Sequence, residues 1–190
     1  MNLEELVQQI RSVHEQLARH AKQAVDLSLT LRNWLIGCQI QEYELRGQDR
    51  SRYGARLYKI LPARLEQCGL PNYKWRQLYC FRNFYRTYPQ ILWSLTTKFK
   101  RLLPSTIPEA KFEAVPLPKS DASVIPMEKL LESLSYTHFE LLTAIENPLA
   151  RAFYEAEAVH GLWSCRDLKR QIASLYFERS ALSHDKAKLA

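Results

Sequence analysis

Apolar side chains recur in alternating steps of three and four along the first 45 residues, which is the spacing of one face of a helix. No proline interrupts this stretch, and its single glycine is Gly37. The steps form an unbroken heptad series, whose a and d places hold Leu3, Leu6, Ile10, Val13, Leu17, His20, Ala24, Leu27, Leu31, Trp34, Cys38, Gln41 and Leu45. The pattern predicts one long helix, or two collinear helices, over residues 3–45.

The two halves of this predicted helix differ in the width of their apolar surface. Residues 1–23 keep a narrow stripe, whereas the second half adds apolar residues around most of its circumference: Val25, Leu29, Leu35, Ile36, Ile40 and Tyr43. We therefore expect the second half to lie in the core. The narrow stripe needs a partner helix, which is either a second copy of the chain or a later segment of the same chain.

A second and a third helix are predicted on either side of a short turn. Residues 53–67 keep a helical period, although Pro62 is expected to kink or shorten that helix. In the following turn, Gly69 suits the end of one helix and Pro71 suits the first turn of the next, which should extend over residues 71–88. Two helices joined by a short turn that contains glycine are the sequence form of a helix-turn-helix.

Proline content separates the chain into three parts. Residues 97–126 contain five prolines and few regular apolar steps, which predicts a linker or a loop-rich excursion. Residues 1–96 should hold the long helix and the first helix-turn-helix. Residues 127–190 should form a second helical unit that resembles a helix-turn-helix.

Helical signals resume after the proline-rich part. The expected helices are residues 127–134, 136–145, 148–160 with an Asn147 cap, and a last helix to about Leu182 that opens with a capping box at Ser164–Asp167. No convincing pair of strands appears, so the only room for a small β-ribbon is within residues 91–126. The sequence therefore predicts an all-α, multi-helical fold with a long N-terminal helix and one or two helix-turn-helix units, of plain or winged form.

The net charge of +7 is concentrated in one stretch of the chain. Between Gln67 and Pro108 there is no Asp or Glu, yet aromatic residues alternate there with Lys74, Arg76, Arg82, Arg86, Lys98, Lys100 and Arg101. Cations release the counterions of phosphates, and aromatic rings stack on bases, so this composition is typical of a polyanion binder. The plainer alternative is a solvated basic flank over an aromatic core.

A helical wheel of residues 71–88 separates two faces. Trp75, Leu78, Phe81, Tyr85 and Tyr88 fall on one side, and the other side carries Arg76, Tyr79, Arg82, Asn83 and Arg86. In the DNA major groove, Arg pairs with guanine and Asn with adenine, and Arg also clamps phosphates. Because no acid lies on this face, we expect it to contact DNA.

The last predicted helix also has a basic face opposite an apolar face, but with less net positive charge. Arg166, Lys169 and Arg170 lie opposite Leu168 and Ile172, but acidic residues dilute the charge. A second phosphate-contacting helix and an ordinary amphipathic surface helix both fit this pattern.

The search for catalytic or metal-binding residues gives none. The five histidines and four scattered cysteines lack metal-ligand spacing, and no nucleotide-binding or hydrolase motif occurs. The triplet Glu109-Ala110-Lys111 has the E-x-K form of metal-dependent nucleases, but it lies among prolines without an upstream Asp, so we interpret it as coincidence. No catalytic residue, metal or cofactor is therefore predicted. Without an apolar run of membrane-spanning length or a secretory signal, the expected location is the cytoplasm, with no membrane partner.

Four strings along the chain resemble a known family. These are Leu-Arg-Asn-Trp-Leu-Ile-Gly at 31–37, Arg-Asn-Phe-Tyr at 82–85, Ala-Phe-Tyr-Glu at 152–155, and Trp-Ser-Cys-Arg-Asp-Leu-Lys-Arg-Gln-Ile at 163–172. Together they resemble the N-terminal domain of YhcG-like proteins, over most of residues 20–186. The resemblance implies a helical domain that binds DNA through a winged helix or helix-turn-helix and precedes a PD-(D/E)XK nuclease domain. The chain departs from the family at Pro71, where a capping Ser is usual, and in its proline-rich excursion.

Two functions follow as expectations. The first is a non-catalytic module that contacts duplex DNA, because the nuclease half that the resemblance implies is not found in this chain. The second is a protein-interaction or oligomerisation module, which recruits a PD-(D/E)XK nuclease domain on another chain, or forms a homodimer, through the 3–45 helix. A nuclease in its own right is disfavoured, since the acidic cluster is missing.

Overall fold

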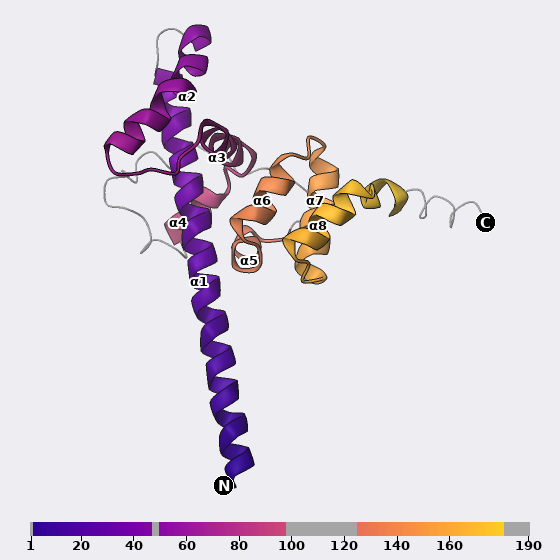
Figure 1. Cartoon of the computed structure of the whole chain (residues 1–190). Coiled ribbons are helices and arrows are strands. Elements are labelled where there is room, and N and C mark those ends of the chain that lie inside the picture. The colour runs from indigo at the N-terminus through magenta and orange to yellow at the C-terminus, as the bar shows by residue number, and fades with distance from the viewer. Residues whose placement is uncertain (1, 47–49, 98–124, 181–190) are drawn as a thin grey trace, which may run out of the picture.

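The computed structural model describes residues 2–46, 50–97 and 125–180 (Figure 1). These residues form α1 (Leu3–Arg46), α2 (Arg50–Gln67), α3 (Trp75–Thr87), α4 (Ile91–Thr97), α5 (Met127–Ser133), α6 (Tyr136–Thr143), α7 (Pro148–His160) and α8 (Cys165–Ala173), and residues 176–180 are helical again. No strand occurs among the described residues, which confirms the all-α prediction for them. Within the stretch that could have held a β-ribbon, residues 91–97 form α4 and residues 98–124 lie outside the described part.

α1 is one unbroken helix of 44 residues, as the heptad pattern predicts. It begins with reciprocal capping, because the backbone N–H of Glu5 donates to Asn2 Oδ1 at 2.8 Å and that of Asn2 donates to Glu5 Oε2 at 3.0 Å. Its second half enters the core, as expected: Leu31, Trp34 and Cys38 are buried. Val25, Leu29 and Tyr43, which the pattern also places in the core, are exposed at 56%, 39% and 52%, so the expectation holds for only part of this half.

The N-terminal half of α1 projects away from the rest of the molecule (Figure 1). Residues 2–25 are all exposed, including the apolar side chains of the heptad stripe. No described segment covers this stripe, so the intramolecular partner that the pattern left open is not found among the described residues.

The body of the molecule forms where α3 packs closely on the second half of α1. A Cβ atom at Gly37 would lie 2.0 Å from the backbone oxygen of Phe81, so glycine is what permits this approach of the two helices. Trp34 is fully buried beside the contact, and its Nε1–H donates to the backbone oxygen of Tyr88 at 2.9 Å. α5, α6 and α7 complete the same buried cluster, which includes Leu130, Phe139 and Tyr154.

The turn after α2 is a Schellman motif. The N–H of Leu70 donates to the oxygen of Leu65 at 2.9 Å, the N–H of Gly69 donates to that of Glu66 at 3.0 Å, and Gly69 has a φ of +78°. The predicted role of Gly69 is thus confirmed, and α2 continues through Pro62. The predicted start of the next helix at Pro71 is wrong, because Asn72 takes a φ of 88° and α3 begins only at Trp75.

The C-terminal helices agree with the predicted ones except at the end. Asn147 caps α7 by accepting from the N–H of Leu149 at 2.9 Å. The last helix was expected to reach Leu182, but α8 ends at Ala173, and Leu175 has a φ of 52°. Beyond this break, the aromatic rings of Tyr176 and Phe177 both pack against Phe153, so tertiary packing redirects the chain.

The division into three parts stays a prediction. Residues 98–124 of the expected linker lie outside the described residues. On either side of it, residues from α1, α3 and α4 share one buried cluster with residues from α5 to α8.

Candidate nucleic-acid interface

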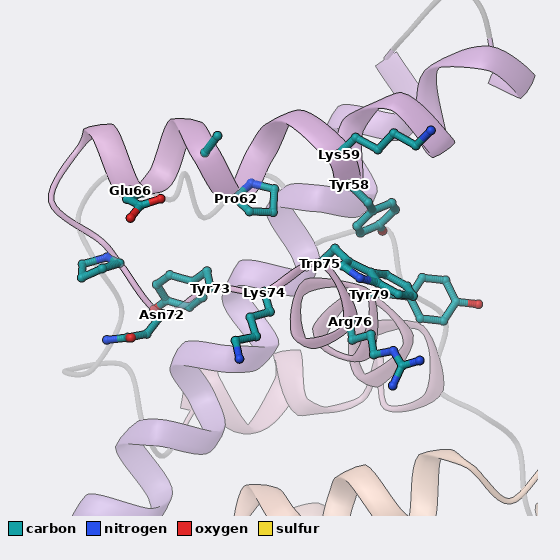
Figure 2. Close-up of a pocket in the computed structure, with 12 residues that line it drawn as sticks. Tyr58, Lys59, Pro62, Glu66, Asn72, Tyr73, Lys74, Trp75, Arg76 and Tyr79 are labelled. Atoms are coloured by element: carbon teal, nitrogen blue, oxygen red, sulfur yellow. The ribbon is translucent and has the colours of Figure 1, made fainter.

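The buried side of α3 agrees with the helical wheel at Leu78, Phe81 and Tyr88 but not at Trp75. Leu78, Phe81 and Phe84 are buried against α1 and α6. Trp75 was expected on the buried side but is 53% exposed. The reason is that α3 starts at this residue, where its ring faces the space between α2 and α3 rather than the core (Figure 2).

An open groove of about 1020 Å³ lies between α2, the 68–74 turn and the start of α3 (Figure 2). Aromatic rings line it from all three elements, and basic side chains stand beside them. The lining residues are Tyr58, Lys59, Pro62, Ala63, Glu66, Pro71, Asn72, Tyr73, Lys74, Trp75, Arg76 and Tyr79. The sequence did not predict this groove, because its walls come from two helices whose relative placement only the fold sets.

The rings and cations of the groove contact one another. The guanidinium carbon of Arg76 lies 5.4 Å from the centre of the Trp75 ring, and the Tyr79 ring meets Tyr58 edge to face at 5.8 Å. Tyr79 is 44% exposed. Exposed rings beside cations are the arrangement on which an unpaired base can stack while the cation meets its phosphate.

The groove also lies at an N-terminus of a helix that has no side-chain cap. Lys74 is the N-cap of α3 and makes no capping hydrogen bond with its side chain, and the first turn contains no acid. The first N–H groups of a helix carry a partial positive charge that favours anions. This end of α3 therefore adds to the positive potential of Lys74 and Arg76.

Arg82 differs from the other predicted contacts because its charge is already paired. Its Nε donates to Glu44 Oε2 of α1 at 2.7 Å, and its Nη1 donates to Asn83 Oδ1 at 3.2 Å. The expectation that no acid pairs with the arginines of this face is therefore wrong for Arg82. The partner comes from α1, 38 residues away in the chain, where a wheel of α3 cannot show it. This ion pair ties α3 to α1.

Arg76 and Arg86 keep the exposure that a contact to DNA needs. Both side chains are exposed, and no carboxylate within the described ranges pairs with either. Ten residues separate them, which corresponds to about 15 Å along the helix axis. The outer side of α3 thus offers two exposed guanidinium groups with Tyr79 between them.

The second predicted cluster lies on α8. Arg166 and Lys169 are exposed, whereas Arg170 pairs with Asp167 at 2.9 Å. Hydrogen bonds from Ser164, and then the nearby Arg170, lower the pKa of Asp167. α6 packs against both α3 and α8 and lies between these two helices (Figure 1).

A histidine and a cysteine that the sequence analysis did not connect lie together near the start of α8. Cys165 Sγ is 3.3 Å from His138 Nδ1 and 3.5 Å from Nε2. Nδ1 accepts from the backbone N–H of Ser135 at 3.2 Å, so Nε2 carries the proton and donates to the oxygen of Trp163 at 3.0 Å. Both ring nitrogens are occupied by backbone groups, which assigns His138 to holding α6 and the 161–164 turn together.

This arrangement predicts a pH dependence of stability. Burial lowers the pKa of His138 below its usual value of 6.5, so the folded chain resists protonation while the unfolded chain accepts the proton. The free energy of unfolding should therefore fall as the pH drops below about 6.5. In His138→Gln, which keeps an acceptor at this helix position, urea unfolding followed between pH 7.5 and 5 should show a shallower fall. Identical profiles for the two proteins would contradict the assignment.

Neither a metal-binding cluster nor a membrane-spanning helix is found among the described residues. No group of three or more His, Cys, Asp or Glu side chains in this part of the chain could hold a metal ion, and the Glu109–Lys111 triplet lies outside it. None of the described helices is long and apolar enough to cross a membrane.

Comparison with known proteins identifies the family. The model of the DUF1016 N-terminal domain matches residues 5–104 and 121–179. The protein named "Putative nuclease YhcG" of Escherichia coli (strain K12) is 31% identical over 159 residues, which cover 80% of this chain. The match spans 40% of the length of that relative. No solved structure matches the chain. The chain therefore belongs to the DUF1016 N-terminal domain family, which confirms its resemblance to the N-terminal domain of YhcG-like proteins.

Proposed function

We propose that this chain is a DNA-binding module without catalysis of its own, and that the α2–α3 groove and the outer side of α3 hold the nucleic acid. The observation that carries the proposal is the groove itself, where exposed aromatic rings stand beside Lys59, Lys74 and Arg76. The relative carries the name "Putative nuclease YhcG", and nucleic acid is the substrate of a nuclease, which supports binding of nucleic acid by this domain.

The order of α2, turn and α3 supports a helix-turn-helix role for α3. The connection of residues 68–74 is longer than the three or four residues usual in that motif, and the extra length forms part of the groove. In this proposal Arg76, Tyr79 and Arg86 contact duplex DNA directly. Arg82 and Asn83 act mainly by positioning α3 on α1, because Glu44 already occupies the guanidinium of Arg82.

The α8 cluster is assigned a supporting role. Arg166 and Lys169 are exposed and can contact a flanking phosphate. Arg170 can do so once its exposed ion pair with Asp167 breaks, and such a pair contributes little stability in water. Contacts of this kind position a protein on DNA without reading sequence.

Replacing Arg76 and Arg86 together with glutamine tests the proposal. Each lost phosphate contact should reduce the slope of log affinity against log salt by about 0.9, so the double variant should bind duplex DNA more weakly and with a slope smaller by about 1.8. Fluorescence anisotropy with a labelled duplex, over a series of salt concentrations, measures both quantities. Arg11→Gln is the matched control, since it removes one exposed guanidinium from the projecting half of α1. Unchanged affinity and slope in the double variant would reject the α3 assignment.

A substitution at Trp75 tests separately whether the aromatic part of the groove stacks on bases. Trp75→Leu keeps an apolar side chain but removes the ring, and base stacking is worth about 1–3 kcal/mol. We expect this variant to lose roughly 5- to 150-fold in affinity for a single-stranded oligonucleotide and less for a duplex. Equal losses on both substrates would place Trp75 at a backbone contact instead of a base.

A second candidate function is supported by one observation, the apolar stripe on the projecting half of α1. It fits a module that associates with another protein, either a chain with a PD-(D/E)XK nuclease domain or a second copy of itself. The two functions are compatible, because α1 residues 2–25 and the α2–α3 groove are separate surfaces.

A further inference from the structure

The projecting half of α1 carries a continuous apolar stripe that no described residue covers. The exposed fractions are 77% for Leu3, 37% for Leu6, 47% for Val7, 61% for Ile10, 57% for Val13 and 62% for Leu17. An open hollow of about 630 Å³ follows this stripe and is lined by Leu6, Gln9, Ile10, Val13, His14, Leu17 and Ala18. Contiguous exposed apolar surface of this kind marks an interaction site.

The residues beside the stripe suit a second copy of the same helix. In the heptad, Gln9 and Gln16 occupy g places, and Val7, His14 and Ala21 occupy e places. No Asp, Glu, Lys or Arg stands at these flanking places up to residue 21. Two copies can therefore meet along this stripe without placing like carboxylate or ammonium charges beside the seam.

The charges on the outer faces favour an antiparallel pair. Glu4 and Glu5 lie near the start of α1, whereas Arg19 and Lys22 lie about four to five turns later. In a parallel pair, acids would lie level with acids and bases with bases. In an antiparallel pair, the acidic end of each helix lies beside the basic stretch of the other.

The position of the body favours the same orientation. Leu31, Trp34 and Cys38, which hold the a and d places between residues 31 and 38 of α1, are buried in the chain's own core. A parallel partner would bring its own body to the same level along α1, so both bodies would crowd one end of the pair. An antiparallel partner places its body beyond the free N-terminal end of α1, where no described residue lies (Figure 1).

We propose that residues 3–20 of α1 pair antiparallel with the same residues of a second copy. In this register Leu6 packs against the partner's Leu17, and Ile10 packs against the partner's Val13. Glu4 then lies level with the partner's Arg19. The overlap ends before Asp26 and Leu27, which are already partly buried by the body.

The pairing sets the distance between the two bodies. Gly37, where α3 crosses α1, is about 25 residues from the centre of the pair, so the two α3 helices lie roughly 75 Å apart. The self-association itself does not depend on the proposed function. If each body binds DNA, the pair binds bivalently, and a duplex long enough to meet both bodies is held more tightly than a short one.

Light scattering of the full chain, from low to high micromolar concentration and without DNA, tests self-association. We expect twice the mass of one chain for the wild type. Ile10→Glu combined with Leu17→Glu should weaken association by about 100-fold or more, because two charges from each chain would be buried in the seam. Both side chains are exposed in the single chain, so circular dichroism should show an unchanged fold. Gln8→Glu, on the opposite face, is the control and should stay dimeric. A wild-type chain that is monomeric throughout, or a double variant that still dimerises, would overturn the proposal.

Disulfide trapping distinguishes the two orientations. Cys68 is exposed, so the test uses a Cys68→Ser background, which should not cross-link on its own. Leu6→Cys and Leu17→Cys, made separately with one of them tagged, should form a mixed disulfide when combined and little disulfide when alone. A disulfide between two Leu6→Cys chains would indicate a parallel pair and overturn the antiparallel register.

Discussion

Replacing Gly37 with alanine is expected to destabilise the fold severely. The new Cβ would lie 2.0 Å from the backbone oxygen of Phe81, 2.5 Å from its carbonyl carbon and 3.0 Å from the backbone nitrogen of Arg82. These are backbone atoms of a packed helix, so α1 and α3 must move apart to admit the methyl group. Overpacking of a core costs about 1–3 kcal/mol, and a backbone clash this close should reach about 3 kcal/mol or more.

The prediction for Gly37→Ala is decisive because a helix without a neighbour would show the opposite change in the free energy of unfolding. In a helix without a neighbour, Gly→Ala would stabilise by about 1 kcal/mol, because alanine has the higher helix propensity. Urea unfolding followed by circular dichroism measures the difference. Gly69→Ala serves as the comparison, since its φ of +78° strains alanine but no atom lies within 4 Å of the new Cβ, and we expect it to cost about 1–2 kcal/mol. A Gly37→Ala protein as stable as the wild type would mean that α3 does not approach α1 as described.

Trp34→Ala is expected to have an effect of similar size for a different reason. Trp34 is fully buried, its ring centre lies 4.9 Å from that of Tyr85, and its Nε1–H donates to the backbone oxygen of Tyr88. Removing the side chain should cost about 3–5 kcal/mol through lost burial and the cavity left behind. Against a total stability of about 5–15 kcal/mol, the variant should be largely unfolded at moderate temperature.

Trp34→Phe separates the hydrogen bond from the packing. It keeps a buried ring but leaves the oxygen of Tyr88 without its donor, which should cost about 1–3 kcal/mol. Trp75→Ala is the matched control, because Trp75 is 53% exposed and its loss should change the midpoint of urea unfolding only slightly. Equal effects at the two tryptophans would contradict the burial that the structure assigns them.

The tyrosine that receives this hydrogen bond continues the network into α7. The hydroxyl of Tyr88 donates to Glu155 Oε1 at 2.7 Å, and burial raises the pKa of Glu155 although this bond and the nearby Arg151 act to lower it. α1, the end of α3 and α7 are thus joined through one aromatic residue. The loss of stability in Trp34 variants should therefore extend to the C-terminal helices as well as to α1.

Features that depend on residues within one or two helical turns were predicted correctly from the sequence alone. The heptad steps of α1, the glycine end of α2 at Gly69 and the caps at Asn147 and Ser164 depend on residues two to five positions apart. The apolar surface on most sides of the second half of α1 correctly predicted the burial of Leu35 and Ile40, although Val25, Leu29 and Tyr43 are exposed. The family followed from four short strings, which the match over residues 5–104 and 121–179 confirms.

Residues that meet across long separations in the chain were decided by tertiary structure. Glu44 neutralises Arg82 from 38 residues away, and the α2–α3 groove exposes Trp75, which the wheel had placed inside. The rings of Tyr176 and Phe177 pack against Phe153 just after α8 ends at Ala173. The physical reason is common to all three: a helical pattern shows which side of a helix is apolar or charged, whereas the partner of that side depends on how other helices are placed against it.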